Sequence, residues 1–212
     1  MTENYKKYTQ IEHVLARPGM YIGDTKCAVS NCWIITNNKA ELKSCKWNPG
    51  IFKIFDEILV NAADEVQRNK CVKCIKVKIE DNEISVFNDS GIPIEIHPEY
   101  KVYIPELIFA NLLTSSNYDD SQKRTTGGLN GLGAKLVAIF SEYFIVETAK
   151  DGKKYTQKFE KNLSKINKPN ISTCKSEYTK ITFKPDFEKF GTTGNVSYTH
   201  LRAHDTYPHL VC

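Results

Sequence analysis

A glycine-rich stretch from Thr126 to Lys135 constrains this chain more than any other feature of its sequence. It reads Thr-Gly-Gly-Leu-Asn-Gly-Leu-Gly-Ala-Lys and runs directly into the apolar segment Leu136 to Phe140. Glycine lets a backbone turn sharply and approach a ligand closely. A helix that opens at Gly133 or Ala134 would direct free N–H groups at an anion, and Lys135 adds a mobile positive charge. The stretch therefore predicts a loop that closes over phosphate groups.

This stretch matches neither of the two most familiar phosphate-binding motifs. Gly128 and Gly133 have the spacing of a P-loop, but Leu136 stands where that motif needs a magnesium-binding hydroxyl. The segment Gly131-Leu132-Gly133 lacks the third glycine and the preceding strand of a dinucleotide-binding fingerprint. Taken alone, the stretch is equally compatible with a surface loop before a helix.

A predicted helix from Phe52 to Glu65 carries the second candidate group. Its apolar residues recur at helical spacing, and Pro49-Gly50 just before it is typical of a helix start. Glu57 and Asn61 are four residues apart, so they project from the same side, one turn apart. A carboxylate can take a proton from water, and an amide oxygen can bind Mg²⁺. The alternative is a solvated face, but a place beside the apolar stripe favours a pocket rim.

The third candidate is a predicted strand, Glu83 to Phe87, that leads into the turn Asn88-Asp89-Ser90-Gly91. Ile84 and Val86 alternate with other residues, as in a strand with one buried face. Asp89, at the end of this strand, could accept a hydrogen bond from an exocyclic amine. An ordinary hairpin turn is the simpler interpretation of this segment by itself.

Six blocks occur in order along the chain: Thr9–Gly23, Glu57–Asp64, Asn88–His97, Leu112–Asp120, Thr126–Lys135 and Tyr178–Phe187. Together they resemble the ATPase domain of eukaryotic-type, including viral, type IIA DNA topoisomerases, in the superfamily of gyrase, Hsp90, MutL and histidine kinases. The resemblance implies an α+β fold: a two-layer α/β sandwich of the Bergerat ATPase type, with a mixed, mostly antiparallel sheet and helices on one face. Residues 1–191 would form the ATP-binding domain, with an N-terminal strap at residues 1–23.

The resemblance also implies roles for individual residues. Glu57 corresponds to the general base that activates the attacking water, and Asn61 to the Mg²⁺ ligand that also touches the phosphates. Asp89 corresponds to the position that recognises the adenine amino group. The other implied ATP-binding residues are Ser115, Ser116 and Asn117 near the ribose and phosphates, and the lid residues Gly128, Leu129, Asn130, Gly131, Leu132, Gly133, Ala134 and Lys135. The implied cofactors are ATP and Mg²⁺.

The chain departs from the family pattern in two of these segments. The family's Asp/Asn-Gly-x-Gly-Ile becomes Asp89-Ser90-Gly91-Ile92, which is one residue shorter and lacks the first glycine. We expect this turn to shift and to weaken adenine binding. The family's Arg-Asn-Gly-Tyr-Gly in the lid becomes Leu129-Asn130-Gly131-Leu132-Gly133, which removes a charge and an aromatic contact. We expect nucleotide binding to survive this change.

The resemblance ends near Phe190-Gly191. The family continues into a transducer domain, which supplies a lysine to the γ-phosphate, and into a DNA-cleaving core, and neither follows here. The segment Val196–His204 instead resembles a translated sequencing adapter. We therefore expect residues 192–212 to be a non-native or disordered tail, and we reject a metal site built from His200, His204 and Cys212.

The composition is that of an ordinary globular domain, with 41% hydrophobic and 25% charged residues. The net charge of +4 comes from scattered residues, so it permits DNA contact without arguing for it. Seven cysteines, an odd number, indicate reduced thiols inside a cell, and the single Cys71-Val72-Lys73-Cys74 motif lacks further zinc ligands. No apolar run approaches a membrane span, so no membrane association is expected.

The predicted function is an ATP-driven clamp that dimerises when ATP is bound and gates the passage of a DNA duplex. The full-length protein would be an ATP-dependent type II topoisomerase that contacts DNA mainly through its other domains. It would act in the nucleus if eukaryotic, or at a cytoplasmic replication site if viral. The alternatives are a fragment that binds ATP without turnover, or another ATPase of the superfamily, such as a chaperone or mismatch-repair protein.

The remaining secondary structure is expected as follows. We expect two strands around Cys32–Ile35, a helix at Pro105–Leu113 with proline in its first turn, and a helix from Lys135 to about Phe140. Further strands are expected near Ile75–Ile79, Phe144–Thr148, Lys154–Glu160 and Thr179–Lys184, and a polar connection at Lys161–Lys175.

Overall fold

The computed structural model of this chain describes residues 7–36, 39–80, 82–111 and 131–192. Six of the predicted ATP-binding residues therefore lie outside the described residues: Ser115, Ser116, Asn117, Gly128, Leu129 and Asn130. The tail from residue 193 onward also lies outside them.

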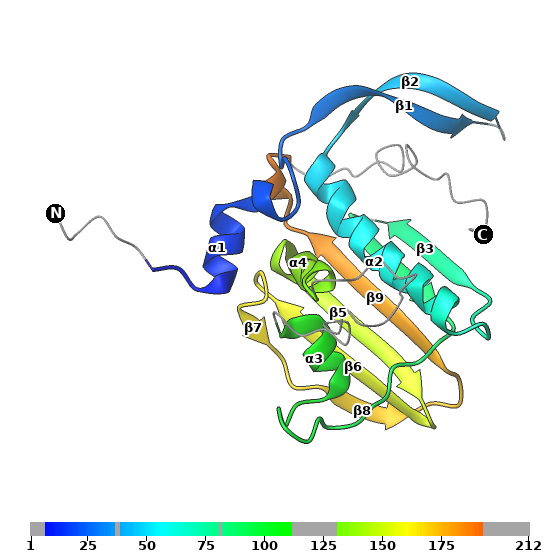
Figure 1. Cartoon of the computed structure of the whole chain (residues 1–212). Coiled ribbons are helices and arrows are strands. Elements are labelled where there is room, and N and C mark those ends of the chain that lie inside the picture. Colours follow the sequence, from blue (N-terminus) through cyan, green and yellow to red (C-terminus); the bar gives the residue numbers. More distant parts are fainter. Residues whose placement is uncertain (1–6, 37–38, 81, 112–130, 193–212) are drawn as a thin grey trace, which may run out of the picture.

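A seven-stranded sheet forms one layer of the fold (Figure 1). Its strand order is β3-β4-β9-β5-β6-β7, and β8 pairs with β6. The strands are β3 (Ile75–Glu80), β4 (Glu83–Asn88), β5 (Ser141–Lys150), β6 (Lys153–Glu160), β7 (Lys165–Ile166), β8 (Asn170–Thr173) and β9 (Tyr178–Pro185). Every pairing between these described strands is antiparallel.

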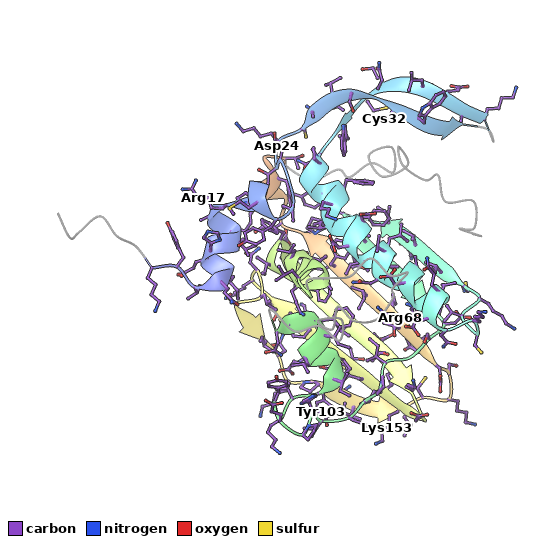
Figure 2. All side chains as sticks on the ribbon, in the orientation of Figure 1. Arg17, Asp24, Cys32, Arg68, Tyr103 and Lys153 are labelled. Carbon is purple, nitrogen blue, oxygen red and sulfur yellow. The ribbon has the colours of Figure 1, made fainter. Side chains whose placement is uncertain are left out.

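Three helices form the second layer and cover one face of this sheet (Figure 1). They are α2 (Pro49–Arg68), α3 (Ile104–Ala110) and α4 (Gly133–Ile139). Side chains fill the space between these helices and the sheet (Figure 2). The predicted two-layer α+β architecture with helices on one face is thus confirmed, with antiparallel pairing throughout the described strands.

The long helix α2 begins earlier than its sequence signals predicted. Pro49 and Gly50 were expected to precede the helix, but both lie within its first turn. Asn48 is the N-cap: its side chain accepts a hydrogen bond from the Ile51 N–H at 3.1 Å. Proline suits the first helical position because its missing N–H would have no partner there in any case. The predicted amphipathic stripe is buried, as Ile54 and Ile58 show.

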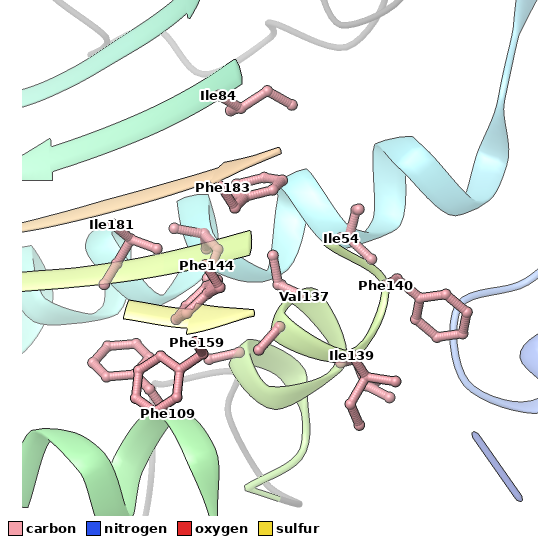
Figure 3. Packing of buried hydrophobic residues seen from close by; sticks show 14 of the residues in the cluster. Ile54, Ile84, Phe109, Val137, Ile139, Phe140, Phe144, Phe159, Ile181 and Phe183 are labelled. Carbon is pink, nitrogen blue, oxygen red and sulfur yellow. The ribbon is translucent and has the colours of Figure 1, made fainter. Parts of the chain in front are cut away.

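Two apolar rows across the central strands form the centre of the core (Figure 3). Directly opposed residues of antiparallel strands share one face of a sheet. Both rows belong to one buried cluster with Ile54 of α2 and Val137 of α4, so they lie on the helix-covered face. The two rows run across β4, β9 and β5 and consist of Ile84, Phe183 and Phe144, and of Val86, Ile181 and Val146. All six side chains are at most 4% exposed, so this core fixes the position of α2 above the sheet.

A β-hairpin outside the main sheet confirms the strands predicted around Cys32–Ile35. It consists of β1 (Ala28–Thr36) and β2 (Lys39–Trp47), which form a separate two-stranded sheet. Figure 1 shows this hairpin extending away from the two layers. Asn48, which follows β2, joins it to the body because its amide donates to the carbonyl oxygens of Thr25 and Phe190.

Other parts of the secondary structure differ from the sequence-based expectations. The segment Lys161–Lys175 is not merely a polar connection, because it contains the short strands β7 and β8. Both strands are exposed and pair through backbone groups, so no apolar alternation marks them in the sequence. The helix α1 (Gln10–Ala16) was also missed, although Thr9 and Glu12 form a capping box at its start. Two short 3₁₀ turns complete the fold, η1 (Pro18–Met20) and η2 (Phe187–Phe190).

The described helices include none that is long and apolar enough to cross a membrane.

Candidate active site

A stripe of polar residues runs along one face of α2. It includes Glu57 and Asn61, the two residues of this helix that the sequence predicted for the site. Its members are spaced four residues apart: Lys53, Glu57, Asn61 and Glu65. Asn61 is exposed, so its amide is accessible to a ligand. The stripe runs the length of the helix and therefore reaches two separate regions beside it: the start of α4 and the turn that follows β4.

Glu57 is held at its position by a neighbouring lysine. Lys53 Nζ lies 2.6 Å from Glu57 Oε1 and 3.8 Å from Asp56 Oδ2. Although burial acts to lower it, the pKa of Lys53 is raised, because the hydrogen bond to Glu57 and the two carboxylate charges favour the ammonium form. The sequence interpretation did not include Lys53, but its i, i+4 spacing to Glu57 would have identified it.

The start of α4 lies directly against the Glu57 carboxylate. A Cβ atom placed on Gly133 would overlap Glu57 Oε2 and would lie 2.7 Å from Glu57 Cδ. The helix begins at Gly133, as predicted, and Gly131 and Leu132 come just before it. The glycine-rich stretch and the Glu57 helix, which the sequence predicted separately, therefore meet where Gly133 lies against the Glu57 carboxylate.

Lys135 is buried rather than mobile. It is 2% exposed, and its Nζ donates a hydrogen bond to the backbone carbonyl of Gly131, in its own loop. Burial lowers the pKa of Lys135 to about 8. The expectation of a mobile charge was wrong, because Lys135 lies in α4, where every residue from Ala134 to Ile139 is buried. The ammonium group lies against the glycine loop that precedes the helix.

The face of the sheet below α2 changes from apolar to polar at one end. Beyond the two apolar rows, the next row across β4, β9 and β5 consists of Asn88, Thr179 and Thr148. These three side chains are 8%, 6% and 0% exposed. Sequence reasoning did not single out this row, because its members come from three distant segments. This row bonds to the turn that follows β4: Thr179 Oγ1 donates to the Ser90 carbonyl at 2.7 Å, and Asn88 Oδ1 accepts from the Ser90 N–H at 3.0 Å.

Asp89 lies just past the end of β4 and faces a neighbouring loop. Its Oδ1 accepts hydrogen bonds from the N–H groups of Lys73 and Cys74, each at 3.1 Å. Successive strand residues point to opposite faces, so Asn88 shares the helix-covered face with Val86 whereas Asp89 does not. Extending the alternation of Ile84 and Val86 by two residues would have identified Asn88 in the sequence.

The turn after β4 is packed tightly against β5. A Cβ on Gly91 would overlap the carbonyl oxygen of Ala149 and would lie 2.8 Å from Lys150 Cβ. The Ile92 N–H donates to Thr148 Oγ1 at 2.9 Å. The shortened turn therefore lies directly over the polar row, in contact with the backbone of the central strand.

Cys71 and Cys74 form the single CxxC motif of the sequence, and both are free thiols. Within the described residues, no group of three or more His, Cys, Asp or Glu side chains is arranged to hold a metal ion.

Replacing Gly133 by alanine tests the contact between α4 and Glu57 against the ATP hydrolysis that the sequence resemblance implies. The new methyl group would displace the Glu57 carboxylate, and a misplacement of about 1 Å is enough to slow such a reaction about 100-fold without unfolding the domain. The atoms that it meets belong to the end of a flexible side chain, so the fold can accommodate it. Single-turnover hydrolysis and thermal unfolding would be measured on both proteins. An unchanged rate would contradict the contact between α4 and Glu57.

No protein-family model matches the chain. DNA topoisomerase 2 of Pisum sativum is 53% identical to it over 196 residues, and DNA topoisomerase 2 of Saccharomyces cerevisiae is 50% identical over 199 residues. These alignments cover 89% and 90% of this chain but 13% and 14% of the two relatives. The chain thus spans only a small part of the length of the relatives that it matches.

Solved structures of two ATPase domains also superimpose on this chain. The ATPase region of Saccharomyces cerevisiae topoisomerase II superimposes with a TM-score of 0.92 at 47% identity, covering 95% of this chain and 56% of that one. The ATPase domain of Thermus thermophilus gyrase B superimposes with a TM-score of 0.67 at 27% identity, covering 91% of this chain and 43% of that one.

The fold is thus that of an ATPase domain of the kind found in gyrase B and topoisomerase II. Within that class, the chain belongs to the eukaryotic DNA topoisomerase II family and corresponds to its N-terminal ATPase region. The resemblance predicted from the sequence blocks is confirmed.

Proposed function

We propose that this chain binds ATP together with Mg²⁺ and hydrolyses it, as the clamp domain of an ATP-dependent type II DNA topoisomerase. The observation that supports this most directly is the contact between the Glu57 carboxylate and Gly133, with Asn61 exposed one helical turn further along. Glu57 takes the proton from the attacking water. Phosphoryl transfer depends mainly on positioning and on neutralising charge. Glu57 and Asn61 would supply the positioning, and Lys135 with a Mg²⁺ ion would supply the positive charge.

The phosphate side of the site consists of Asn61, the glycine loop and Lys135. Asn61 offers an amide oxygen to Mg²⁺, which prefers oxygen ligands and would neutralise charge on the phosphates. Lys135, with a pKa of about 8, is mostly protonated at pH 7, and its ammonium lies beside Gly131 in the loop. The resemblance assigns the lid over the phosphates to Gly131, Leu132, Gly133 and Ala134, together with Gly128, Leu129 and Asn130. The resemblance assigns Ser115, Ser116 and Asn117 to the ribose and phosphates.

The base side of the site consists of the end of β4 and the polar row below it. The family resemblance assigns the adenine amino group to Asp89. Its Oδ1 already accepts two backbone hydrogen bonds, whereas the neighbouring Asn88 lies on the face covered by α2. We therefore propose that Asn88 contributes to base recognition, with Asp89 holding the loop at Lys73 and Cys74 in place.

The wider function follows from the family. The resemblance assigns residues 1–191 to the ATP-binding domain and residues 1–23 to a strap over the partner subunit's nucleotide, and it does not extend to residues 192–212. ATP favours the closed homodimer because it binds that form better than the open one, and closure retains a DNA duplex. The eukaryotic relatives support an intracellular location, in the nucleus of a eukaryotic cell.

Calorimetric titration with a non-hydrolysable ATP analogue, with and without Mg²⁺, tests this function. We expect the chain to bind the analogue more tightly when Mg²⁺ is present. Replacing Asn61 by alanine should weaken binding in Mg²⁺ about tenfold, the scale of one polar contact to a charged group, and should have little effect without Mg²⁺. Gln67→Ala is a matched control, because it removes another exposed amide from the same helix.

Two outcomes of this titration would contradict the proposal. If the unmodified chain bound no analogue, its assignment as an ATP-binding domain would fail. If Asn61→Ala bound the ATP analogue with the same affinity as the unmodified chain, both with and without Mg²⁺, Asn61 would not be a Mg²⁺ ligand. The assignment of an ATP-binding site would be unaffected. A chain that binds ATP but releases no phosphate in a single-turnover assay would be a binding module rather than an enzyme.

A further inference from the structure

Ser90, the residue that replaces the family's first glycine in the shortened turn, makes contacts on both sides of the site. Its hydroxyl donates a hydrogen bond to Glu65 Oε1 at 2.8 Å, and Glu65 belongs to the polar stripe of α2. Its carbonyl oxygen accepts a hydrogen bond from Thr179 Oγ1 at 2.7 Å, and Thr179 belongs to the polar row. Glycine at this position would lack the first of these contacts, because it has no side chain.

We propose that Ser90 is a positioning residue for nucleotide binding, which fixes the base-side turn to the helix that carries Glu57 and Asn61. The proposal rests on the proposed function of the site and concerns how this chain retains base selectivity with a turn one residue shorter. Glu65 lies two helical turns beyond Glu57 on the same stripe, so a turn bound to Glu65 is also fixed relative to the phosphate-side residues.

The energetics of the contact favour this role. Ser90 is 8% exposed, and its acceptor is a carboxylate. A hydrogen bond with an ionised partner is stronger than one between neutral groups. Asn69, the C-cap of α2, adds a weaker contact, since its Nδ2 lies 3.5 Å from Ser90 Oγ.

The backbone of the turn is anchored independently of this contact. The Ser90 N–H donates to Asn88 Oδ1 at 3.0 Å, so the serine also orients the buried amide that we place beside the base. Gly91 is packed against β5, and Ile92 is bonded to Thr148. Loss of the Ser90 hydroxyl therefore releases the turn from α2 while leaving it on the sheet, which changes base recognition without unfolding the domain.

The test compares the affinities of non-hydrolysable analogues of ATP and GTP across a set of variants. Ser90→Ala is expected to bind the ATP analogue about tenfold more weakly and to lower the preference for ATP over GTP. Glu65→Ala should have the same effect, and the double variant should be no worse than either single one, since both remove one interaction. Ser90→Thr keeps the hydroxyl and should restore both the affinity and the preference.

Ser141→Ala is the matched control for a purely structural loss. Ser141 is fully buried, and its hydroxyl donates to the Val137 carbonyl, away from the turn. This variant should lower the thermal unfolding temperature without changing the ratio of the two affinities. Thermal unfolding of every variant separates a loss of fold from a loss of positioning, and Glu65→Ala and Ser90→Thr keep the test decisive if Ser90→Ala does not fold.

The outcomes distinguish this inference from the proposed function. If the unmodified chain binds the ATP analogue but Ser90→Ala keeps the same affinity and the same preference, the positioning role is refuted and the ATP site stands. If the effects of Ser90→Ala and Glu65→Ala add in the double variant, the two residues do not act through one contact and the inference is likewise overturned. If the unmodified chain binds neither analogue, the proposed function fails, and the inference fails with it.

Discussion

Replacing Glu57 by glutamine is expected to abolish ATP hydrolysis while leaving ATP affinity nearly unchanged. Glutamine keeps the size and polarity of the side chain but cannot take a proton from water. General-base catalysis contributes roughly 100- to 10,000-fold to a rate, so hydrolysis should fall by about that factor. The amide can still accept a hydrogen bond from Lys53 Nζ, so the side chain should keep its place beside Gly133.

The measurement is single-turnover hydrolysis of labelled ATP with the chain in excess, together with a titration of the ATP analogue. Asp56→Asn is a matched control, because it removes the same charge from the neighbouring residue, also near Lys53, at 3.8 Å. The control should hydrolyse ATP at the unmodified rate. If Glu57→Gln also did so, Glu57 would not be the general base.

Replacing Gly91 by alanine is expected to be the most damaging single-methyl change in the turn. The added Cβ would overlap the Ala149 carbonyl oxygen, and it would lie 2.9 Å from the Ala149 carbonyl carbon and 2.8 Å from Lys150 Cβ. Most of these atoms are backbone of β5, which is paired on both sides, with β6 and with β9, so they cannot move aside locally. Overpacking of this kind costs about 1–3 kcal/mol.

Thermal unfolding and nucleotide titration would measure the effect of Gly91→Ala. A loss of about 3 kcal/mol should lower the unfolding temperature of a domain this size by roughly 6–12 °C. Affinity for the ATP analogue should also fall, since the turn must move off the polar row. Gly19→Ala is the matched control, because a Cβ there would have no atom within 4 Å. Equal unfolding temperatures for the two variants would show that the turn is not packed as described.

Lys135 illustrates where local reasoning about the site failed. The sequence correctly predicted a helix that opens at Gly133, because a glycine loop followed by an apolar run is a local signal. It predicted a mobile lysine, yet the side chain is 2% exposed. The burial depends on how closely α4 packs against α2 and the sheet, and no local pattern encodes that packing.

The sequence by itself determined the helix and the strand that carry the candidate site residues. Helical spacing placed Glu57 and Asn61 on one side of a helix, and alternation predicted the strand before Asn88. Both signals arise within a few residues, where the period of the backbone alone decides which side chains share a face. The ordered blocks also led to the correct family.

Only the tertiary structure decided which of these segments meet. It brought Gly133 against Glu57, assembled Asn88, Thr179 and Thr148 into one row, and joined Ser90 to Glu65. The residues of these contacts come from segments as far as 91 positions apart (88 to 179), and their register is set by strand pairing and by the apolar core under α2. Such contacts result from the packing of the whole domain, and therefore no periodicity in the sequence reports them.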